Sequence, residues 1–250
     1  MQKNLVILRA GDASLHRVWL AQSNREFDIF VSYYGNTAGA MQDGADYYEV
    51  RKGPKWSCIA ELLLERQELL DKYSAFWFPD DDLLATTETL NRMFGFFHTF
   101  GLSLAQPALT NDSYHYWPIT LQDSRYLIRF TQFVEVMAPI FDRTALKACA
   151  QTFGESRSGW GLDFVWPKLC GRGRHDSIGI IDATPVKHTR PLGGELYKNN
   201  AELTPHDDAE KMLKKYGVER IRKTATKYSF GGVKSMENLV RNKLIFRLGL

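Results

Sequence analysis

A run of three aspartates follows directly on a short apolar segment. Residues 75–78 read Ala-Phe-Trp-Phe, and after Pro79 come Asp80, Asp81 and Asp82. Adjacent carboxylates repel one another unless a cation lies between them, and carboxylate oxygens suit the hard ions Mg²⁺ and Mn²⁺. On an extended chain Asp80 and Asp82 project to one side and Asp81 to the other. A solvated acidic turn or a helix N-terminus explains a bare run better, but the position at a strand end favours a divalent cation site.

A second segment carries polar groups beyond another apolar run. Residues 178–181 lead to Asp182 and then to Lys187 and His188. An imidazole beside carboxylates would favour Mn²⁺ over Mg²⁺. Lys187 could instead face a phosphate as a point charge. A packed or surface histidine is the alternative, so this segment is a weak signal by itself.

A glycine-rich aromatic stretch places one more carboxylate in an apolar setting. Residues 158–164 read Ser-Gly-Trp-Gly-Leu-Asp-Phe and contain Asp163. Partial burial would raise the pKa of this carboxyl group and suit it to general-base catalysis. A turn that Asp163 caps explains these residues equally well.

Strands and helices alternate along the chain, and the candidate residues fall at strand ends. Apolar runs predict strands at 4–8, 27–33, 75–78, 102–105 and 178–181, with one or two more within 126–141. Helical spacing predicts helices at 59–73, after Thr86 or Thr87, and after Asp142. This order predicts an α/β fold: a mainly parallel sheet with helices on both faces, where ligands bind at the carboxyl ends of the strands.

The composition is that of a folded protein from a reducing compartment. Of the 250 residues, 44% are apolar and 24% charged, enough for one α/β domain with a smaller appendage. The three cysteines are odd in number and widely spaced, which argues against a disulfide framework. The first apolar run is too short for a signal peptide, and no run approaches the ~20 residues of a membrane helix. We therefore expect a soluble, cytoplasmic protein.

The net charge of +3 hides an asymmetry between body and tail. Residues 211–250 hold eleven Lys and Arg against two Asp and Glu, whereas the rest of the chain is acidic. A basic tail could pack on the domain, contact a partner or touch an anionic membrane surface. Nucleic acid is the weakest partner, because no nucleic-acid-reading motif accompanies the charge.

Several common catalytic motifs are missing from the sequence. It contains no G-x-x-x-x-G-K-[ST] phosphate loop, no G-x-G-x-x-G, no G-x-S-x-G and no H-E-x-x-H. Their absence weakens the NTPase, dehydrogenase, hydrolase and zinc-protease hypotheses.

Taken together and in this order, the segments resemble the GT-A glycosyltransferase superfamily. They are more closely similar to an uncharacterised plant and bacterial family of unknown function that is described as glycosyltransferase-like. The matching stretches are 78–83, 105–109, 133–141, 159–163 and 178–188. The resemblance covers roughly residues 75–194 and implies a GT-A (Rossmann-like) catalytic domain over 1–194, followed by a basic extension over 195–250.

The resemblance implies a role for each matching residue. Asp80 would face the donor ribose or a metal-bound water, beside Asp81, while Asp80, Asp82 and His188 would hold Mn²⁺ or Mg²⁺. Asp163 would be the catalytic base, and Glu135, in the preceding strand, would orient the acceptor or donor sugar. The residues implied for the nucleotide and the diphosphate are Arg9, Ala10, Gly11, Lys55 and Trp56.

The implied activity is transfer of a sugar from a nucleotide-diphosphate sugar to an acceptor hydroxyl, with inversion, as in polysaccharide biosynthesis. The acceptor would be a glycan or a lipid-linked molecule, which the basic tail could help to approach at the inner face of a membrane. Two alternatives stay open: a nucleotidyltransferase on a related fold, and a non-catalytic module that binds nucleotide or carbohydrate.

Overall fold

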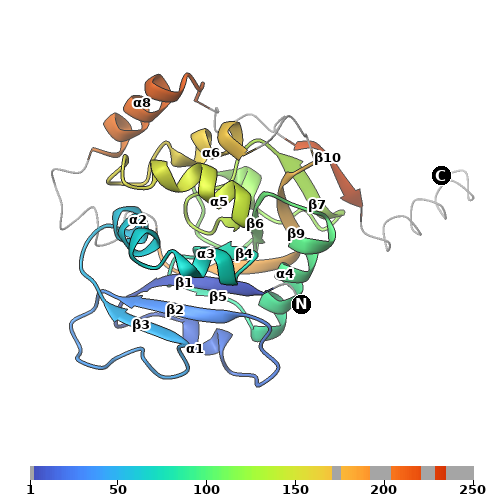
Figure 1. Ribbon diagram of the computed structural model, residues 1–250. Coiled ribbons are helices and arrows are strands. Elements are labelled where there is room, and N and C mark those ends of the chain that lie inside the picture. Colours follow the sequence, from blue (N-terminus) through green and yellow to red (C-terminus); the bar gives the residue numbers. More distant parts are fainter. Residues whose placement is uncertain (1–2, 171–175, 192–203, 221–228, 235–250) are drawn as a thin grey trace, which may run out of the picture.

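The protein is described by a computed structural model that covers residues 3–170, 176–191, 204–220 and 229–234 (Figure 1). Its strands are β1 (Asn4–Ala10), β2 (Asp28–Tyr33), β3 (Tyr47–Val50), β4 (Ala75–Trp77), β5 (Leu83–Leu84), β6 (Leu104–Leu109), β7 (Tyr126–Thr131), β8 (Ile140–Asp142), β9 (Ile178–His188) and β10 (Ser229–Lys234). Its α-helices are α1 (His16–Trp19), α2 (Lys55–Glu65), α3 (Glu68–Lys72), α4 (Thr87–Thr99), α5 (Arg143–Cys149), α6 (Leu162–Cys170) and α8 (Pro205–Tyr216). Short 3₁₀ turns cover Pro118–Thr120 and Ala150–Thr152.

The strands form an open mixed sheet in the order β10-β7-β9-β6-β8-β4-β1-β2-β3. Strands β3, β2, β1 and β4 run parallel to one another, and β6 and β9 run parallel to each other. Strand β8 lies antiparallel between β4 and β6, and β7 lies antiparallel between β9 and β10. The α/β class is as predicted, but the sheet is mixed rather than mainly parallel. The stretch 126–141 supplies two antiparallel strands that join the sheet without helical crossovers.

The sheet is covered on both faces, as the alternation along β1 shows. Val6, Leu8 and Ala10 belong to a hydrophobic cluster that includes side chains of α1 and α4. Leu5 and Ile7 point to the other face, where a second cluster is lined by α2, α3, α5 and α6. All five side chains are buried. A strand buried on both faces reads as a continuous apolar run, which is why β1 was easy to predict.

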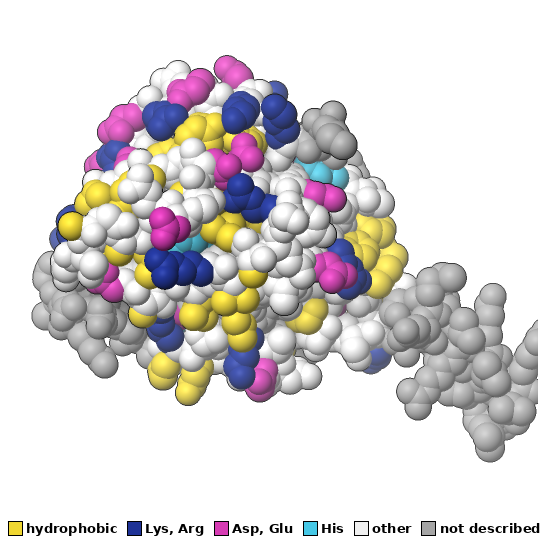
Figure 2. All heavy atoms as spheres, turned by 90° about the horizontal axis from the view of Figure 1, so that it is seen from below, with side chains coloured by type: hydrophobic (Ala, Val, Ile, Leu, Met, Phe, Trp, Pro, Cys, Tyr) yellow, Lys and Arg dark blue, Asp and Glu magenta, His cyan; other side chains and the backbone are white. Residues whose placement is uncertain are grey.

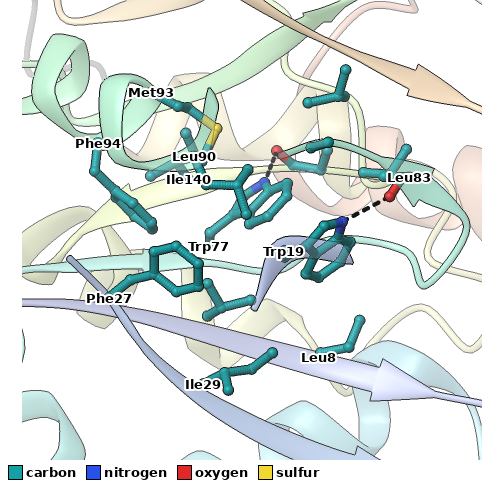
Figure 3. Packing of buried hydrophobic residues seen from close by; sticks show 14 of the residues in the cluster. Leu8, Trp19, Phe27, Ile29, Trp77, Leu83, Leu90, Met93, Phe94 and Ile140 are labelled. Carbon is teal, nitrogen blue, oxygen red and sulfur yellow. Dashed lines mark hydrogen bonds between the residues drawn. The ribbon is translucent and has the colours of Figure 1, made fainter. Parts of the chain in front are cut away.

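Most of the aromatic residues serve the core. Figure 3 shows Trp19 and Trp77 packed together, with ring centroids 5.3 Å apart, above the sheet residues Leu8 and Ile29. Each indole N–H donates to a backbone carbonyl, Trp19 to Leu83 (2.9 Å) and Trp77 to Ala138 (3.0 Å). Buried tryptophans need such a partner for the indole N–H. These two bonds tie the chain on either side of the aspartate run into the core.

The predicted helix starts are confirmed where a capping side chain marks them. Thr86 caps α4 by accepting from the amide of Thr89, and Asp142 caps α5 by accepting from that of Ala145. The helix predicted over 59–73 is instead two helices, because α2 ends at Glu65 and α3 begins at Glu68. Strand β3 was not predicted, since it is a short edge strand with little burial.

Strand β9 builds the link between the sheet and the aspartates. Its first half pairs in parallel with β6, and its last residues pair in antiparallel with β5, directly after the aspartate run. His188 therefore lies opposite Leu83. The curvature of one long strand brings two distant sequence segments together at the carboxyl edge of the sheet.

The face of the molecule seen in Figure 2 has no patch of a single charge. Acidic and basic side chains are interspersed there among apolar ones. Within the described ranges, no helix has the length and hydropathy needed to cross a bilayer. Much of the basic tail, 221–228 and 235–250, lies outside the described residues.

Candidate active site

The three aspartates beyond β4 point to three different sets of partners. Asp80 makes an ion pair with Lys55 at 2.6 Å, and its own amide donates to the carbonyl of Met137 at 2.8 Å. The Lys55 ammonium also donates to the carbonyls of Val136 and Met137, both at 3.1 Å. Lys55 thus joins the first turn of α2 to the aspartate run and to the loop between β7 and β8.

Asp81 is buried and fully engaged. Its Oδ2 accepts from the amide of Gly11 at 2.7 Å and from the Tyr34 hydroxyl at 3.2 Å, and its Oδ1 pairs with the Arg190 guanidinium at 2.9 Å. Burial raises the pKa of Asp81, while the Gly11 amide and Arg190 oppose that rise. This carboxylate fastens the ends of β1, β2 and β9 to one another.

The antiparallel pairing of β5 with β9 brings Asp82, just before β5, next to His188 at the end of β9. His188 Nε2 lies 3.2 Å from Asp82 Oδ2, and Nδ1 lies 2.7 Å from the carbonyl oxygen of Tyr114. Burial opposes protonation of the ring, but the hydrogen bond and charge of Asp82 outweigh it and raise the pKa of His188 to about 9. The imidazole is therefore a cation at neutral pH.

Buried carboxylate oxygens that lack a hydrogen-bond donor indicate whether these residues could hold a divalent metal. Among the described residues, no three His, Cys, Asp or Glu side chains stand together as a group that could hold a metal ion. Two buried carboxylate oxygens, Asp82 Oδ1 and Glu135 Oε2, have no hydrogen-bond partner within the same residues. Buried oxygens without a donor are costly, and a cation would satisfy them. Asp82 and His188 thus fit the predicted metal, whereas Asp80 is turned to Lys55.

Glu135 lies at the centre of the predicted residues. It belongs to the loop between β7 and β8, not to a strand as expected, and its amide donates to Gln106 Oε1 at 2.6 Å. Burial, followed by the charge of Asp163, raises the pKa of Glu135 to about 8, while His188 and Lys55 oppose the rise. Asp80 adds to it. Glu135 is therefore close enough to feel the charges of four other predicted site residues.

Asp163 lies in the first turn of α6 and is 5% exposed. Burial raises its pKa to about 7, while nearby backbone amides lower it. Its Oδ1 accepts from the amide of Phe164 at 3.1 Å. A carboxyl group that titrates near neutral pH is suited to accept a proton from a hydroxyl group.

The loop before Asp163 depends on two glycines in the left-handed region. Gly159 has φ +82° and lies against the Trp56 ring, where a Cβ atom would come within 2.7 Å. Gly161 has φ +93° and lies against Ala209 and Met212 of α8. Other residues would be strained there and would also clash. The glycines of the Gly-Trp-Gly-Leu-Asp segment therefore let the chain pass between α2 and α8.

The residues implied for the nucleotide lie at the end of β1, those implied for the diphosphate lie in the first turn of α2, and their exposure differs. Ala10 is fully buried, and Trp56 is 3% exposed and packs against Phe153 and Trp166. Gly11 lies against the ring of Tyr34, where an added Cβ atom would come within 2.9 Å. Of this group, Gly11 is positioned at the rim of the site through its bond to Asp81.

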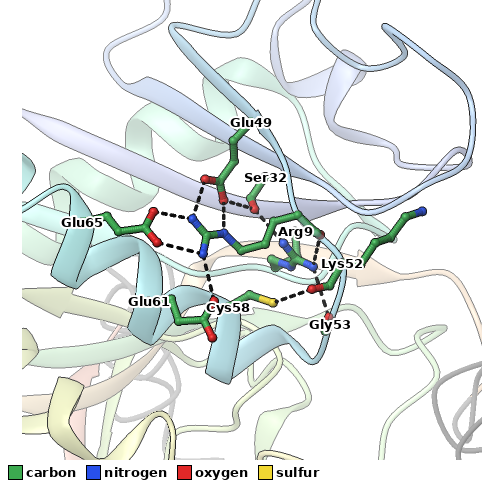
Figure 4. Close-up of polar contacts among 9 residues, drawn as sticks. Arg9, Ser32, Glu49, Lys52, Gly53, Cys58, Glu61 and Glu65 are labelled. Atoms are coloured by element: carbon green, nitrogen blue, oxygen red, sulfur yellow. Dashed lines mark hydrogen bonds and ion pairs between the residues drawn. The ribbon is translucent and has the colours of Figure 1, made fainter.

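Arg9 is buried and holds the segment between β3 and α2. Figure 4 shows its guanidinium pointing toward Ser32 and the backbone of Gly53. It donates to Ser32 Oγ at 2.7 Å and to the carbonyls of Arg51 at 2.7 Å and Gly53 at 3.1 Å. Arg51 in turn pairs with Glu49, Glu61 and Glu65. Arg9 thus positions the chain that leads to Lys55.

Sequence reasoning missed three residues that organise the site. Arg190 and Tyr34 hold Asp81, and Gln106 holds the loop of Glu135. Arg190 lies two positions after His188. Because alternate residues of an extended chain project to the same side, this spacing could have indicated that Arg190 faces the site as His188 does. Two other candidates are used elsewhere: Asp182 forms a buried pair with Arg129 at 2.8 Å, and Lys187 pairs with Asp112 at 2.5 Å, leaving both outside the cluster.

Comparisons with known proteins agree with this fold. A family model described as "Protein of unknown function (DUF707)" matches residues 122–228, a segment that contains Glu135, Asp163 and His188. No curated protein matches the chain. The structure of S. aureus TarS residues 1–349 in complex with UDP-GlcNAc is similar with a TM-score of 0.54 at 14% identity. The match covers 86% of this chain and 65% of that one.

A second solved structure, described as a mycobacterial protein, is similar with a TM-score of 0.52 at 16% identity. That match covers 88% of this chain and 76% of the other. At such identities the likeness concerns the fold alone. The chain therefore has an α/β fold that is also found in a protein whose structure holds a nucleotide-diphosphate sugar.

Proposed function

We propose that this protein is a metal-dependent glycosyltransferase that moves a sugar from a nucleotide-diphosphate sugar to an acceptor hydroxyl group. The observation that carries the proposal is the gathering of Glu135 and Asp163, both with raised pKa values, beside Asp80, His188 and Lys55. These groups lie at the carboxyl edge of the sheet, where α/β folds bind ligands. The fold likeness to TarS with bound UDP-GlcNAc supports the same class of donor.

The donor side offers the cations that a diphosphate needs. Lys55 is held by Asp80 and two carbonyl groups, so its ammonium is already positioned. Asp82 and His188 would hold Mn²⁺ or Mg²⁺, which when bound neutralises the charge that grows on the departing nucleoside diphosphate. Because ligands bind metals in their deprotonated form, the His188 imidazolium would release its Nε2 proton when the metal binds.

The acceptor side offers a base and a proton donor. The acceptor oxygen attacks the anomeric carbon, the bond from that carbon to the diphosphate oxygen breaks, and the hydroxyl proton passes to Asp163. Glu135, with a pKa of about 8, is largely protonated at pH 7 and can donate a hydrogen bond to a sugar oxygen. One displacement of this kind inverts the configuration at the anomeric carbon.

The nucleotide is assigned to the ends of β1 and β2. Gly11 lies against the ring of Tyr34, a residue that is 38% exposed, and both residues are bonded to Asp81. The glycine allows the backbone to approach a ligand closely. Arg9 and Ala10 act from below the surface by holding the segments around this rim, and Trp56 supports the loop that leads to Asp163.

We also propose that the acceptor is a glycan or a lipid-linked molecule that the basic extension approaches at an anionic membrane surface. The charge of residues 211–250 supports this, since each Lys or Arg near such a surface adds roughly 1 kcal/mol. Vesicle binding by the full chain, compared with a chain that lacks 235–250, tests it. Equal binding of the two chains to phosphatidylserine vesicles at 50 mM salt would contradict it.

Thermal-shift and calorimetric titration with UDP-GlcNAc, with and without Mn²⁺, test the main proposal. A ligand that binds the folded state raises the melting temperature. We expect a Mn²⁺-dependent rise for the natural sequence and none for Asp82→Asn. Asp71→Asn, a substitution on the exposed surface, is the matched control and should behave as the unaltered chain.

The products separate this function from the alternatives. A glycosyltransferase releases nucleoside diphosphate, whereas a nucleotidyltransferase releases pyrophosphate from a nucleoside triphosphate. A binding module would give the thermal shift without either product. Metal-dependent binding that survives Asp82→Asn unchanged would remove Asp82 from the site.

A further inference from the structure

Helix α8 lies across the loop that leads to Asp163. Figure 1 shows α8 beside α6, and the two helices are in contact. Three of its side chains, Ala209, Met212 and Leu213, are buried. Met212 belongs to the large cluster on the α6 face of the sheet, and Leu213 packs with the rings of Trp117, Phe133 and Phe164. The helix is therefore part of the domain core rather than a loosely attached appendage.

The first turn of α8 holds the loop through one carboxylate. Asp208 Oδ2 accepts from the amide of Ser158 at 2.9 Å and from the Ser158 hydroxyl at 2.7 Å. That hydroxyl oxygen in turn accepts from the amide of Trp160 at 3.3 Å. Bonds to a carboxylate are stronger than neutral ones. Asp208 thus fixes the backbone five residues before Asp163.

Residues of α8 on either side of Asp208 also contact the loop. The ring of Trp160 lies edge-on to that of His206, with centroids 5.3 Å apart. Gly161 is so close to α8 that a Cβ atom would come within 2.8 Å of Met212 and 3.0 Å of Ala209. Two residues later the chain reaches Asp163. The path of the loop is therefore set by α8 at Ser158, Trp160 and Gly161.

The chain beyond α8 also bears on the base. Arg220 pairs with Glu210 of α8 at 3.1 Å, and its positive charge lowers the pKa of Asp163. The charge of a residue just beyond α8 thus reaches the carboxyl group of Asp163.

We propose that α8 is a working part of the catalytic site, in which Asp208 is a positioning residue that fixes the Ser156–Gly161 loop and thereby the carboxyl group of Asp163. This inference rests on the proposed function for its catalytic consequence, but not for the hold itself. Displacement of a catalytic group by ~1 Å can cost a hundredfold in rate. The proposed function assigns the donor, by contrast, to Asp80 and Lys55, which are bonded to each other and not to the Ser156–Gly161 loop.

Backbone hydrogen exchange and turnover, measured on the full chain, test this with three variants. Asp208→Ala removes the acceptor of both Ser158 bonds. Asp208→Asn keeps an oxygen that can accept them. Asp207→Ala is the matched control, because Asp207 is an exposed acid in the same first turn of α8.

For Asp208→Ala we expect amide exchange in residues 156–164 to be at least tenfold faster than in the unaltered chain. We expect turnover of UDP-GlcNAc, followed as UDP release with Mn²⁺ and water as acceptor, to fall 10- to 100-fold. Calorimetric Kd for UDP-GlcNAc should change less than twofold. Asp208→Asn should recover most of both losses, and Asp207→Ala should show neither.

Unchanged exchange in Asp208→Ala would overturn the proposal, whatever the turnover. Faster exchange with undiminished turnover would also overturn it, because the loop would then be held without consequence for the base. If Asp208→Ala is unfolded at the assay temperature, Ser158→Ala, which removes the hydroxyl group bonded to Asp208 and to the amide of Trp160, is measured in its place, and exchange in residues 156–164 equal to that of the unaltered chain overturns the proposal. Failure of the unaltered chain to bind UDP-GlcNAc would count against the proposed function, while the exchange experiment would still decide whether α8 holds the loop.

Discussion

The two sides of the candidate site treat their carboxyl groups in opposite ways. On the donor side, Asp81 has three partners and Asp80 is paired with Lys55. On the acceptor side, Glu135 Oε2 has no partner within the described residues, and Asp163 accepts from backbone amides close to it in sequence. Burial without a neighbouring cation bonded to the group raises the pKa of Glu135 to about 8 and that of Asp163 to about 7.

The carboxylates on one side of the site therefore hold the structure in place, whereas the carboxyl groups on the other side can take part in a reaction. The donor side is a set of charges already matched to one another, so its residues hold positions that a diphosphate and a metal can use. The acceptor side stores two groups that can exchange a proton near neutral pH. If the comparison is right, removing a donor-side carboxylate costs stability or ligand binding, and removing an acceptor-side carboxyl group costs turnover while leaving the fold intact.

The largest expected effect is the loss of the base. Asp163→Asn keeps the volume of the side chain but cannot accept a proton, so we expect kcat for sugar transfer to fall about 10³-fold. The Kd for the donor should stay within twofold of that of the unaltered chain. In the unaltered chain, the rate should rise with pH through about 7, where Asp163 ionises. Normal turnover by Asp163→Asn would remove the distinction between the two sides.

The next effect concerns how stability depends on pH. The pKa of Glu135 is about 8 in the folded chain against an ordinary value of 4.5. Between these pH values the folded state holds a proton that the unfolded state has lost, so stability falls as pH rises. One such group contributes a slope of about 1.4 kcal/mol per pH unit.

Glu135→Gln removes that slope. We expect the free energy of unfolding of Glu135→Gln, measured by urea denaturation, to increase relative to that of the unaltered chain between pH 5 and 8. The two values should be closest at pH 4.5. Asp163 is ionisable in both chains, so the difference in slope reports Glu135 together with its electrostatic coupling to Asp163. A constant offset between the two chains across this range would contradict the burial of an ionisable Glu135.

The sequence alone predicted candidate residues on both sides of the site, but not the partners that the structure gives them. Asp80, Asp82 and His188 follow apolar runs, and a strand end is a recognisable signal. Asp163 was found with its flanking glycines, whose positive φ angles the structure explains by the approach of Trp56 and α8. By contrast, the residues next to Glu135 in the sequence do not indicate that it is buried, because segments far away in the sequence cover it.

Strand direction was also out of reach of the sequence. An apolar run does not reveal whether it pairs in parallel or antiparallel, because the connections decide that. The three residues of β8 were hidden in a longer β-rich stretch, and their insertion between β4 and β6 makes the sheet mixed. The same insertion carries the loop of Glu135 to the aspartates, through the bonds from Phe78 to Pro139 and from Asp80 to Met137.

A smaller effect is expected on the donor side. Asp81→Ala removes the acceptor for the Gly11 amide, the Tyr34 hydroxyl and Arg190, whose side chain is 39% exposed and can turn to solvent. We expect a loss of about 2 kcal/mol in the free energy of unfolding, the usual value for bonds to a charged group. Asp43→Ala, an exposed position, is the control and should stay within about 0.5 kcal/mol. A stability loss no greater than that of Asp43→Ala would mean that Asp81 is not an architectural carboxylate.

The smallest effect tests whether proximity to the site matters by itself. Lys187 immediately precedes His188, yet its ammonium pairs with Asp112, and the two side chains are 39% and 67% exposed. Exposed pairs contribute roughly 0.2–1 kcal/mol, because both ions stay hydrated and salt screens them. We therefore expect Lys187→Met to lower stability only slightly at 50 mM salt and less at 500 mM, and to leave the Kd for UDP-GlcNAc unchanged. A tenfold weaker Kd would show that Lys187 leaves Asp112 for the diphosphate, so that the donor side extends beyond Lys55 and His188.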